Sequence, residues 1–453
     1  MRLPLLLPPL LVGGLGSAQV LRGHGLWFDE LYTVAVVDRP LGDVVGLVAD
    51  GRGPTAWLTD PPAFNGPYYV VAWSWSRLPL VDLRSDGLDG LRGLSLLASV
   101  LAVAVLVRAV DRLHGQAVAL VAGLLAATAP LLVVQSVQAR PYGLALLATA
   151  LALLGAVRVV HGGGVGLLAV AGGAAGLLHW FALPAVGGLA LGTALVVRRK
   201  APVVALSVAV PVAALPVLGL VALALSHGAT GGGYLTTTGL LVPAAALLAW
   251  APGVLVVPVL VAVGLAAVEQ GARAAGPLVW AWVGVPVVLV TAVDLVRPVF
   301  VPRYLLPALL GLSVVAALGA VGRRWLLVLL LVAAAVADVR ALTRPRWERA
   351  DQVAAFLLAE QRPGEPVVAV EGRSAAGLAV YAAPTRLGAD LRFPPDDPPT
   401  GATRVWLVRQ LGPGGVTVAS DDDDLLRTAG LRLVRTELFR ATKTDLAVQL
   451  WTR

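Results

Sequence analysis

The chain contains no cysteine and few charged residues, and both absences exclude certain kinds of site and classes of protein. Without cysteine, disulfide bonds, thiolate chemistry and cysteine-bound metal sites are excluded. Only 14% of the 453 residues are charged and 58% are hydrophobic, whereas soluble globular chains average about 25% charged and about 45–50% apolar residues. The composition therefore predicts a polytopic membrane protein with one additional domain.

The net charge of +8 comes mainly from arginine, and many of these arginines flank apolar runs. This placement is typical of residues that set the orientation of membrane spans. We therefore expect a lipid bilayer as partner and no nucleic acid. The high usage of Gly, Ala, Val and Arg favours an actinobacterial source.

Apolar runs of about 17–25 residues can cross a bilayer, and the chain has about 11 of them. They cover residues 4–22, 91–110, 117–134, 141–160, 165–181, 183–197, 203–225, 239–264, 276–296, 304–321 and 325–341. The stretch 165–197 is divided at Pro184, and whether it forms one span or two is left open. The first run resembles a signal peptide with the small residues "GSAQ", but we expect an uncleaved span because an acidic pair follows at once.

Basic residues occur at every second turn between these runs, as the positive-inside rule requires. The predicted cytoplasmic positions are Arg2, Arg108, Arg112, His114, Arg158, His161, "RRK" at 198–200, Arg273, Arg323 and Arg324. This pattern predicts a cytoplasmic N-terminus and an extracytoplasmic C-terminus. The stretch 68–80 is too short to span, and its Trp and Tyr residues favour an interfacial or re-entrant segment.

The composition changes after Arg340, where Pro, Asp and Arg become frequent. We predict a transmembrane module over 1–344, with a long first extracytoplasmic loop over 23–90, and a small extracytoplasmic α/β domain over 345–453. The predicted strands are 366–370, 377–383, 404–410, 431–439 and 446–451, and the predicted helices are 347–361 and 421–429. The four aspartates at 421–424 favour the start of a helix.

Polar residues gather at the predicted outer face, inside or beside apolar helices. A charge near the bilayer centre costs about 2.5–3.5 kcal/mol or more, so ionisable residues there are functional candidates. The candidates are Asp29, Glu30, Asp60, Tyr68, Gln138, Arg140, Tyr142, His179, Arg303 and Tyr304. The structural alternative is that Arg140 and Arg303 only extend to the interface from the starts of helices.

These residue types favour transfer of a group from an anionic lipid. Arginine binds phosphate through several charge-assisted hydrogen bonds, and Arg140 and Arg303 are each followed closely by a tyrosine, Tyr142 and Tyr304. A carboxylate at the same depth can act as general base on an acceptor hydroxyl. A phosphate leaving group needs electrostatic stabilisation more than it needs protonation by an acid. One carboxylate base and two arginine side chains therefore suffice for an inverting reaction.

At these residues the chain resembles the GT-C superfamily of polyprenyl-phosphate-sugar-dependent glycosyltransferases. It is similar to the branch that contains protein O-mannosyltransferases, the aminoarabinose transferase of lipid A and actinobacterial mannosyltransferases. The similar stretches are "WFDELYT" (27–33), "PYYVVAWSW" (67–75), "LRGLSLLASVLAV" (91–103), "QARPYGLALL" (138–147), "LLHWF" (177–181), "FVPRYLLPAL" (300–309) and "WERADQVAAFLLAEQRPGEPVVAV" (347–370).

The resemblance implies a multi-pass enzyme of the cytoplasmic membrane whose active site faces outward. Its donor would be a sugar on undecaprenyl or decaprenyl phosphate, with mannose favoured and arabinose next, and its acceptor a hydroxyl on a glycan, lipoglycan or protein. Asp29 would be the base and Glu30 would orient the site or bind acceptor, while Arg140 and Arg303 hold the phosphate.

The chain departs from the family pattern at two of these positions. Gln138 stands where many relatives have an acidic residue, and Asp60 stands where a histidine often precedes the prolines. We therefore expect Asp60, Tyr68, Gln138 and His179 to serve the acceptor or support the site. No metal is assigned, although a divalent cation on Asp29, Glu30, Asp60 and His179 is left open.

Two other classes of protein compete with this interpretation. A transporter or lipid-linked-sugar flippase would also carry charged residues in its spans, but it favours internal repeats and sites at the bilayer midplane. We find no such repeat, and the polar residues gather at one face. A non-catalytic component of a cell-wall complex is the third alternative, and the intact set of acidic and basic residues disfavours it.

Overall fold

The computed structural model describes residues 3–23, 25–55, 58, 65–78, 88–197, 200–227, 236–270, 276–343, 348–370, 372–392, 401–411, 421–441 and 445–453. The chain forms two compact units. The first contains residues 1–21, 39–52 and 60–343, and the second contains residues 22–38, 53–59 and 344–453. The predicted first loop, 23–90, is thereby divided between the units. The predicted domain division at residues 344 and 345 stays a prediction.

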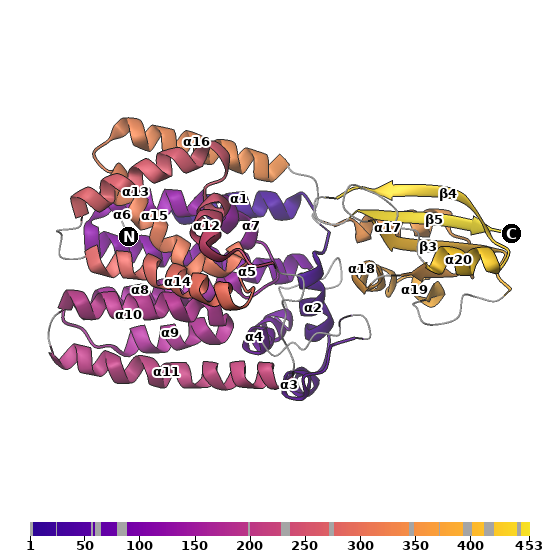
Figure 1. Ribbon diagram of the computed structural model, residues 1–453, viewed down its shortest axis with the longest axis horizontal. Coiled ribbons are helices and arrows are strands. Elements are labelled where there is room, and N and C mark those ends of the chain that lie inside the picture. Colours follow the sequence, from indigo (N-terminus) through magenta and orange to yellow (C-terminus); the bar gives the residue numbers. More distant parts are fainter. Residues whose placement is uncertain are drawn as a thin grey trace. The chain divides into compact units, whose positions relative to one another are not determined.

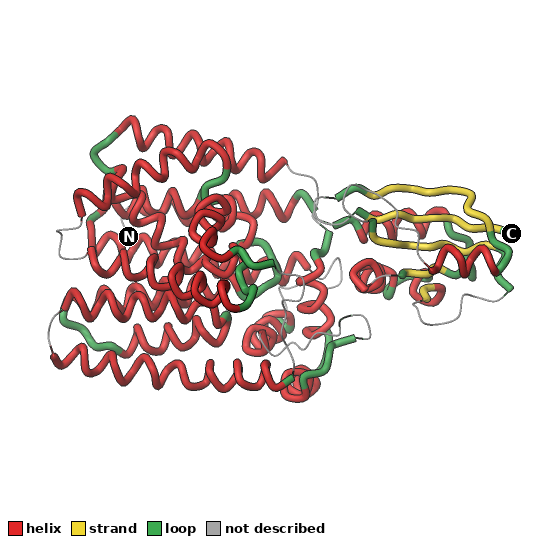
Figure 2. Tube along the Cα trace, viewed as in Figure 1, coloured by secondary structure: helices red, strands yellow, loops and turns green. Residues whose placement is uncertain are grey.

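The described residues of the first unit are helical or irregular, and the strands belong to the second unit (Figures 1 and 2). Its helices are η1 (Leu3–Leu6), α1 (Leu7–Leu21), α3 (Leu41–Asp50), α4 (Gly66–Ser76), α5 (Leu88–His114), α6 (Gln116–Ala127), α7 (Pro130–Gln135), α8 (Tyr142–Val160), α9 (Gly166–Leu178), η3 (Trp180–Ala182), α10 (Leu183–Val197), α11 (Lys200–Ser226), η4 (Gly239–Leu241), α12 (Val242–Trp250), η5 (Gly253–Leu255), α13 (Val256–Gln270), α14 (Gly276–Val296), η6 (Pro302–Leu305), α15 (Leu306–Ala320) and α16 (Arg324–Thr343).

Within the described residues, eight helical segments are long and apolar enough to cross a membrane. They begin at Leu3, Gly90, Tyr142, Trp180, Ala201, Gly276, Pro302 and Arg324, and each covers most of a predicted span. The other three predicted spans contain shorter helices. The run 117–134 is interrupted before Pro130, the run 165–181 ends its helix at Leu178, and the run 239–264 is two helices separated near Gly253, whose φ is +62°.

The predicted break in 165–197 lies at a different residue from the one expected. The helix ends at Leu178 and the next long helix begins at Leu183, so the chain is interrupted at His179 and η3 rather than at Pro184. Pro184 lies near the start of α10, where its missing N–H leaves no intrahelical hydrogen bond unmade.

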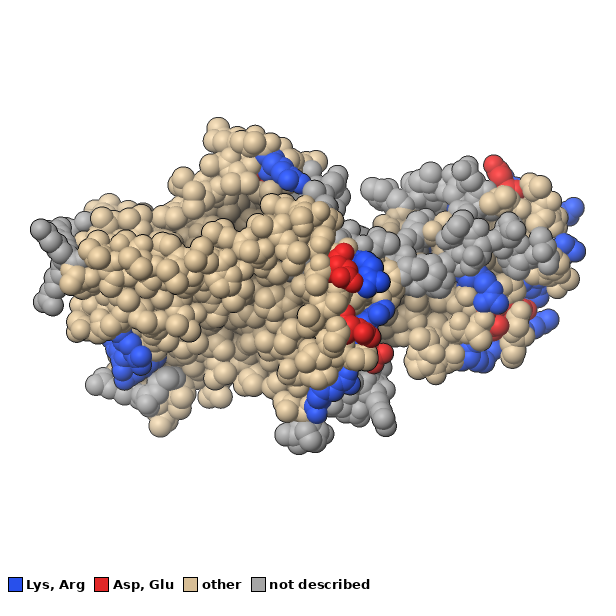
Figure 3. Space-filling view, turned by 90° about the horizontal axis from the view of Figure 1, so that it is seen from below, with Lys and Arg blue, Asp and Glu red and all other residues tan. Residues whose placement is uncertain are grey.

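Large apolar side chains are exposed along the helices of the first unit. Along α11 they recur about every four residues, at Val204, Val208, Val212 and Leu215, each more than half exposed. Figure 3 shows a broad area of uncharged residues on this unit. Water would disfavour such a surface and a bilayer would accept it. The protein is therefore a multi-pass membrane protein.

Small residues let the helices of the first unit pack closely, as is common in membranes. Gly188 and Gly192 of α10 lie against the backbone of α14 at Ala281 and Leu278, and Gly319 of α15 lies against the carbonyl of Ala262 in α13. A Cβ at Gly319 would overlap this carbonyl oxygen, which belongs to helix backbone.

We expect Gly319→Val to destabilise the first unit by at least about 1–3 kcal/mol, because α13 and α15 must separate to admit the side chain. Thermal unfolding of the purified protein, followed by loss of the monodisperse peak in size-exclusion chromatography, would measure the effect. Gly284→Ala is the control, since no described atom outside its own helix and chain neighbours lies within 4 Å of the new Cβ. Equal melting of the two variants would contradict the close approach of α13 and α15.

The described residues of the second unit form a mixed five-stranded sheet in the order β2-β1-β3-β5-β4. The strands are β1 (Val367–Ala369), β2 (Leu391–Arg392), β3 (Arg404–Gln410), β4 (Arg432–Phe439) and β5 (Leu446–Thr452). β1 pairs in parallel with β2 and β3, and β5 pairs antiparallel with β3 and β4. The helices are α2 (Phe28–Val37), α17 (Ala350–Glu360), α18 (Gly372–Ala382), α19 (Leu387–Asp390) and α20 (Asp421–Thr428).

Both faces of β3 are buried, by alternate side chains. Trp406 and Val408 pack with residues of α17 and α18, whereas Val405 and Leu407 pack with Leu426 of α20. This alternation follows from the two-residue repeat of a strand. The predicted small α/β domain at the C-terminus is confirmed, and α20 begins at Asp421 as the acidic run predicts.

One predicted strand is wrong. Residues 377–382 belong to α18 and Ala383 lies in the turn after it. The buried residues Ala375, Leu378 and Ala382 of this helix recur every three or four positions. This spacing suits a helix that covers a sheet rather than a strand within it. The β-branched and aromatic residues of "GLAVYAA" suggested the strand, but packing on the sheet decides the conformation.

Helix α2 packs against α18 within the second unit. The backbone N–H of Leu26 donates a hydrogen bond of 2.9 Å to the hydroxyl of Tyr381. Gly25 lies beside Asp351 and the carbonyl of Glu348, where a Cβ would be too close. These contacts explain why residues 22–38 belong to this unit although they follow the first span.

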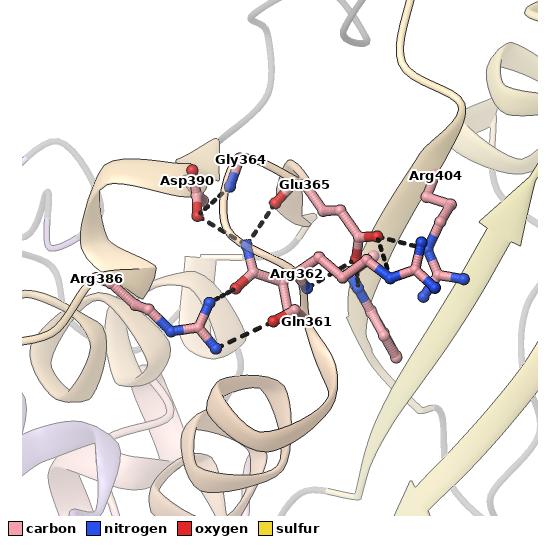
Figure 4. Close-up of polar contacts among 8 residues, drawn as sticks. Gln361, Arg362, Gly364, Glu365, Arg386, Asp390 and Arg404 are labelled. Carbon is pink, nitrogen blue, oxygen red and sulfur yellow. Dashed lines mark hydrogen bonds and ion pairs between the residues drawn. The ribbon is translucent and has the colours of Figure 1, made fainter.

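A polar network joins α17, β1 and β3 in the second unit (Figure 4). The Glu365 carboxylate accepts hydrogen bonds from Arg404, from the Trp406 indole N–H at 2.9 Å and from the Arg362 backbone N–H at 3.1 Å. Gln361 donates to Asp390 at 2.7 Å and accepts from Arg386 at 3.1 Å. Burial raises the pKa of Glu365, but the hydrogen bonds from Trp406, Arg362 and Arg404 outweigh it, so the pKa is lowered.

A lowered pKa makes the second unit sensitive to acid. The contribution of Glu365 to stability is complete above the pKa of about 4.3 that glutamate has in unfolded chains, and it is lost as the pH falls through the lower folded value.

We expect Glu365→Gln to lower the stability of this unit at pH 7 by about 1–3 kcal/mol, and the loss relative to wild type to shrink as the pH falls below about 4.3. Hydrogen exchange of peptides from β1 and β3 would measure the loss at pH 7, and tryptophan fluorescence would follow the pH dependence. Glu437→Gln, at a carboxylate with a 46% exposed side chain, is the control. Equal effects would refute the role of Glu365.

Candidate functional site

The residues before α8 hold Arg140 at the start of that helix. The Arg140 backbone N–H donates to the Gln138 carbonyl at 2.7 Å, and its own carbonyl accepts from the Ser95 hydroxyl of α5 at 3.3 Å. Pro141 then precedes Tyr142, the first residue of α8. The Arg140 backbone is therefore fixed by two neighbouring segments, and its side chain is half-buried.

Arg303 approaches Tyr142 from a distant part of the sequence. It lies in the short helix η6, which leads directly into α15. The Arg303 Nε–H donates a hydrogen bond of 2.7 Å to the Tyr142 hydroxyl. A guanidinium has five N–H donors, so this bond orients Arg303 and occupies one of them.

His179 lies among aromatic rings next to this pair. Its ring centroid is 5.1 Å from that of Tyr142 and 5.3 Å from that of Tyr304. Phe181 stacks on Tyr304 with a centroid distance of 4.3 Å and an interplanar angle of 19°. The extended backbone of His179, with φ −156°, ends α9 and turns the chain into η3, which carries Phe181.

The positive charges of Arg140 and Arg303 both act on His179. His179 is 7% exposed and lies within electrostatic range of both Arg140 and Arg303. Arg140, Tyr142, His179, Arg303 and Tyr304 therefore come together from three separate parts of the first unit; we call them the arginine cluster. Two guanidinium groups beside tyrosine hydroxyls can bind a phosphate or another oxyanion through charge-assisted hydrogen bonds.

Asp29 and Glu30 lie in the first turn of α2, in the second unit. The Glu30 carboxylate accepts a hydrogen bond of 3.2 Å from the Trp27 backbone N–H, and Glu30 is buried. Acidic residues are stabilising at the positive end of a helix, so Glu30 has a capping role as well as a candidate functional one. Asp29 is half-buried on the same turn.

Comparison with known proteins gives a structural match and no sequence match. No family model and no curated protein matches the chain. A crystal structure of ArnT from Cupriavidus metallidurans bound to undecaprenyl phosphate matches with a TM-score of 0.61 and 12% identity, over 97% of this chain and 96% of that one. A structure of the same ArnT in the apo state matches with a TM-score of 0.57 and 13% identity, over 94% and 93%. The chain has the ArnT fold. The predicted fold class is confirmed.

The other predicted site residues differ in what surrounds them. Gln138 is 3% exposed, and neither atom of its amide has a hydrogen-bond partner among the described residues. Tyr68 lies on α4 with its ring 5.7 Å from that of Tyr69 and is fully buried. Asp60 lies outside the described residues. A buried amide without a hydrogen-bond partner is costly, so Gln138 is a candidate to hydrogen-bond a polar group of a bound molecule.

Two residues beside the arginine cluster were not predicted as site residues. Ser95 binds the Arg140 carbonyl and Phe181 stacks on Tyr304, although both lie in the quoted stretches "LRGLS" and "LLHWF". Within the part of the chain that the structure describes, no three His, Asp or Glu residues are placed to hold a metal ion. Because Asp60 lies outside that part, the divalent cation remains untested.

Proposed function

We propose that this protein is an inverting glycosyltransferase that takes a sugar from a polyprenyl-phosphate carrier. The observation that carries the proposal is the arginine cluster, in which Arg303 is oriented by a 2.7 Å hydrogen bond to Tyr142 and both Arg140 and Arg303 act on His179. One structure with the same fold contains an ArnT bound to undecaprenyl phosphate, which supports a lipid phosphate as ligand.

In the proposed reaction, Arg140 and Arg303 bind the phosphate that links sugar and lipid. The acceptor oxygen forms a bond to the anomeric carbon, and the bond from that carbon to the phosphate oxygen breaks. Polyprenyl phosphate leaves with the bonding electrons, and the guanidinium groups stabilise its added negative charge. A phosphate needs no proton to leave, so no general acid is required.

The acceptor hydroxyl must lose its proton as the new bond forms. We assign the role of base to the half-buried Asp29, because Glu30 accepts the hydrogen bond that caps α2. Glu30 would orient the site. Gln138, Tyr68, His179 and Asp60 are proposed to contact the acceptor or the sugar. Tyr142 and Tyr304 are proposed to help bind the phosphate of the sugar donor through their hydroxyl groups.

We propose mannose as the sugar, with arabinose as the alternative, and a glycan, lipoglycan or protein hydroxyl as acceptor. The arginines at alternate turns support a cytoplasmic-membrane protein whose site and C-terminal domain are extracytoplasmic. The sugar, the acceptor and the orientation are proposals independent of the proposal that the arginines bind the lipid phosphate.

Binding of undecaprenyl phosphate to the purified protein in nanodiscs would test the phosphate site. Native mass spectrometry or a fluorescent analogue would compare it with undecaprenol, which has the same chain and no phosphate. We expect undecaprenyl phosphate to bind more tightly, and Arg108→Gln, at an exposed arginine paired with Asp111, to leave binding unchanged. Equal binding of both lipids would contradict the proposal and favour a lipid transporter.

A further inference from the structure

Asp294 is a buried carboxylate near the end of α14 that accepts four backbone hydrogen bonds. One oxygen accepts from Thr238 and Gly239, each at 2.7 Å. The other accepts from Val299 at 2.8 Å and Phe300 at 2.9 Å. The side chain is fully buried, and four N–H donors match the acceptor capacity of an ionised carboxylate.

This position is unfavourable for an acid in every other respect. A carboxylate near the C-terminal end of a helix meets the negative end of the helix dipole, and burial of a charge is costly. The four hydrogen bonds offset these costs. Asp294 thereby joins two segments that are separated by α12, α13 and α14, namely the start of η4 and the residues before η6.

The second of these segments leads directly to the arginine cluster. From Phe300, which Asp294 holds, the chain continues through extended Val301 and Pro302 into Arg303. Proline fixes its own φ near −65°, so little freedom remains between the anchored N–H of Phe300 and Arg303. The Tyr304 backbone N–H also donates to Val301 at 2.9 Å, which closes the turn.

We infer that Asp294 is a positioning residue for Arg303 and thereby sets the affinity of the site for the donor phosphate. This inference rests on the proposed function. Asp294 acts through the backbone and does not contact the substrate. Loss of its carboxylate would free the backbone N–H groups of Val299 and Phe300 and let Arg303 leave its hydrogen bond to Tyr142.

The test is a double-mutant cycle between Asp294→Asn and Arg303→Gln. Asparagine presents an NH₂ group to two backbone N–H donors, so two of the four hydrogen bonds are lost. We expect the Kd for undecaprenyl phosphate and the KM for the sugar donor to rise at least about tenfold. In the double variant the loss should equal that of Arg303→Gln alone, because both changes remove the same interaction.

Asp338→Asn is the matched control, since Asp338 is another buried carboxylate in a membrane helix, 4% exposed on α16. It should leave the Kd for undecaprenyl phosphate unchanged. If Asp294→Asn does not fold, Asp294→Glu keeps the carboxylate and moves the anchored segment by one methylene; a raised donor KM in the folded protein would support the inference.

The outcomes separate this inference from the proposed function. If the wild type binds undecaprenyl phosphate and a folded Asp294 variant binds it equally well, the positioning role is wrong and the proposed function stands. Additive losses in the double variant would assign Asp294 a role independent of Arg303 and would also overturn the inference. If the wild type binds no lipid phosphate, the proposed function itself fails.

Discussion

Arg303→Gln is expected to lower sugar transfer by about 100- to 1,000-fold, the largest effect of any single change in the arginine cluster. Arg303 is oriented by Tyr142 and lies beside Tyr304, with its guanidinium carbon 5.7 Å from the ring centroid. Glutamine has no charge to stabilise the leaving phosphate. Initial rates with polyprenyl-phosphate sugar, together with the Kd for undecaprenyl phosphate, would measure the loss.

Arg303→Lys separates charge from geometry in the same assay. Lysine keeps the positive charge but cannot reproduce the planar guanidinium that donates to Tyr142, so its activity should lie between those of the wild type and the glutamine variant. Tyr142→Phe removes only the acceptor of that bond and should have a smaller effect than either. Wild-type rates in Arg303→Gln would exclude the arginine cluster as the donor site.

Asp29→Asn is expected to lower kcat by about 100- to 10,000-fold and to leave the Kd for undecaprenyl phosphate unchanged. Asparagine has nearly the shape of aspartate but cannot accept the proton of the acceptor hydroxyl. Single-turnover rates in nanodiscs, measured beside lipid binding on the same samples, would separate the chemical step from donor affinity.

Glu30→Gln is the matched comparison, because it makes the same change on the next residue. The glutamine oxygen can still accept the Trp27 N–H, so α2 keeps its cap and we expect a milder loss. A larger loss in Glu30→Gln than in Asp29→Asn would move the base to Glu30. Equal, near wild-type rates in both variants would contradict a carboxylate base in α2.

Much of the fold could be predicted because the bilayer imposes a strong constraint on sequence. Spans such as 141–160 and 276–296 are long apolar runs, and the structure has a continuous helix in each. The run 239–264 is also a long apolar run but contains two helices. Composition does not record where a helix breaks, and the break near Gly253 follows from local backbone geometry.

All five residues of the arginine cluster could be named as candidates from the sequence, because they are polar residues in apolar surroundings. Their contacts could not be predicted, since the hydrogen bond between Arg303 and Tyr142 joins residues 161 positions apart. Asp294 could not be assigned from the sequence, because its partners are backbone N–H groups that carry no signal of residue type. Likewise, nothing in "GLWFDELYT" indicates that α2 packs on α18 in the second unit.

Release of undecaprenyl phosphate from undecaprenyl-phosphate sugar, coupled to a glycosylated acceptor, tests the central claim most directly. The purified protein in nanodiscs would receive carriers of mannose, arabinose, aminoarabinose or glucose and a membrane extract of acceptors. We predict equimolar release of lipid phosphate and glycosylated product with at least one carrier, and a rate at least about 100-fold lower in the Asp29→Asn and Arg303→Gln variants. Bound carriers that are never cleaved, in a protein that moves them between leaflets, would contradict a transferase.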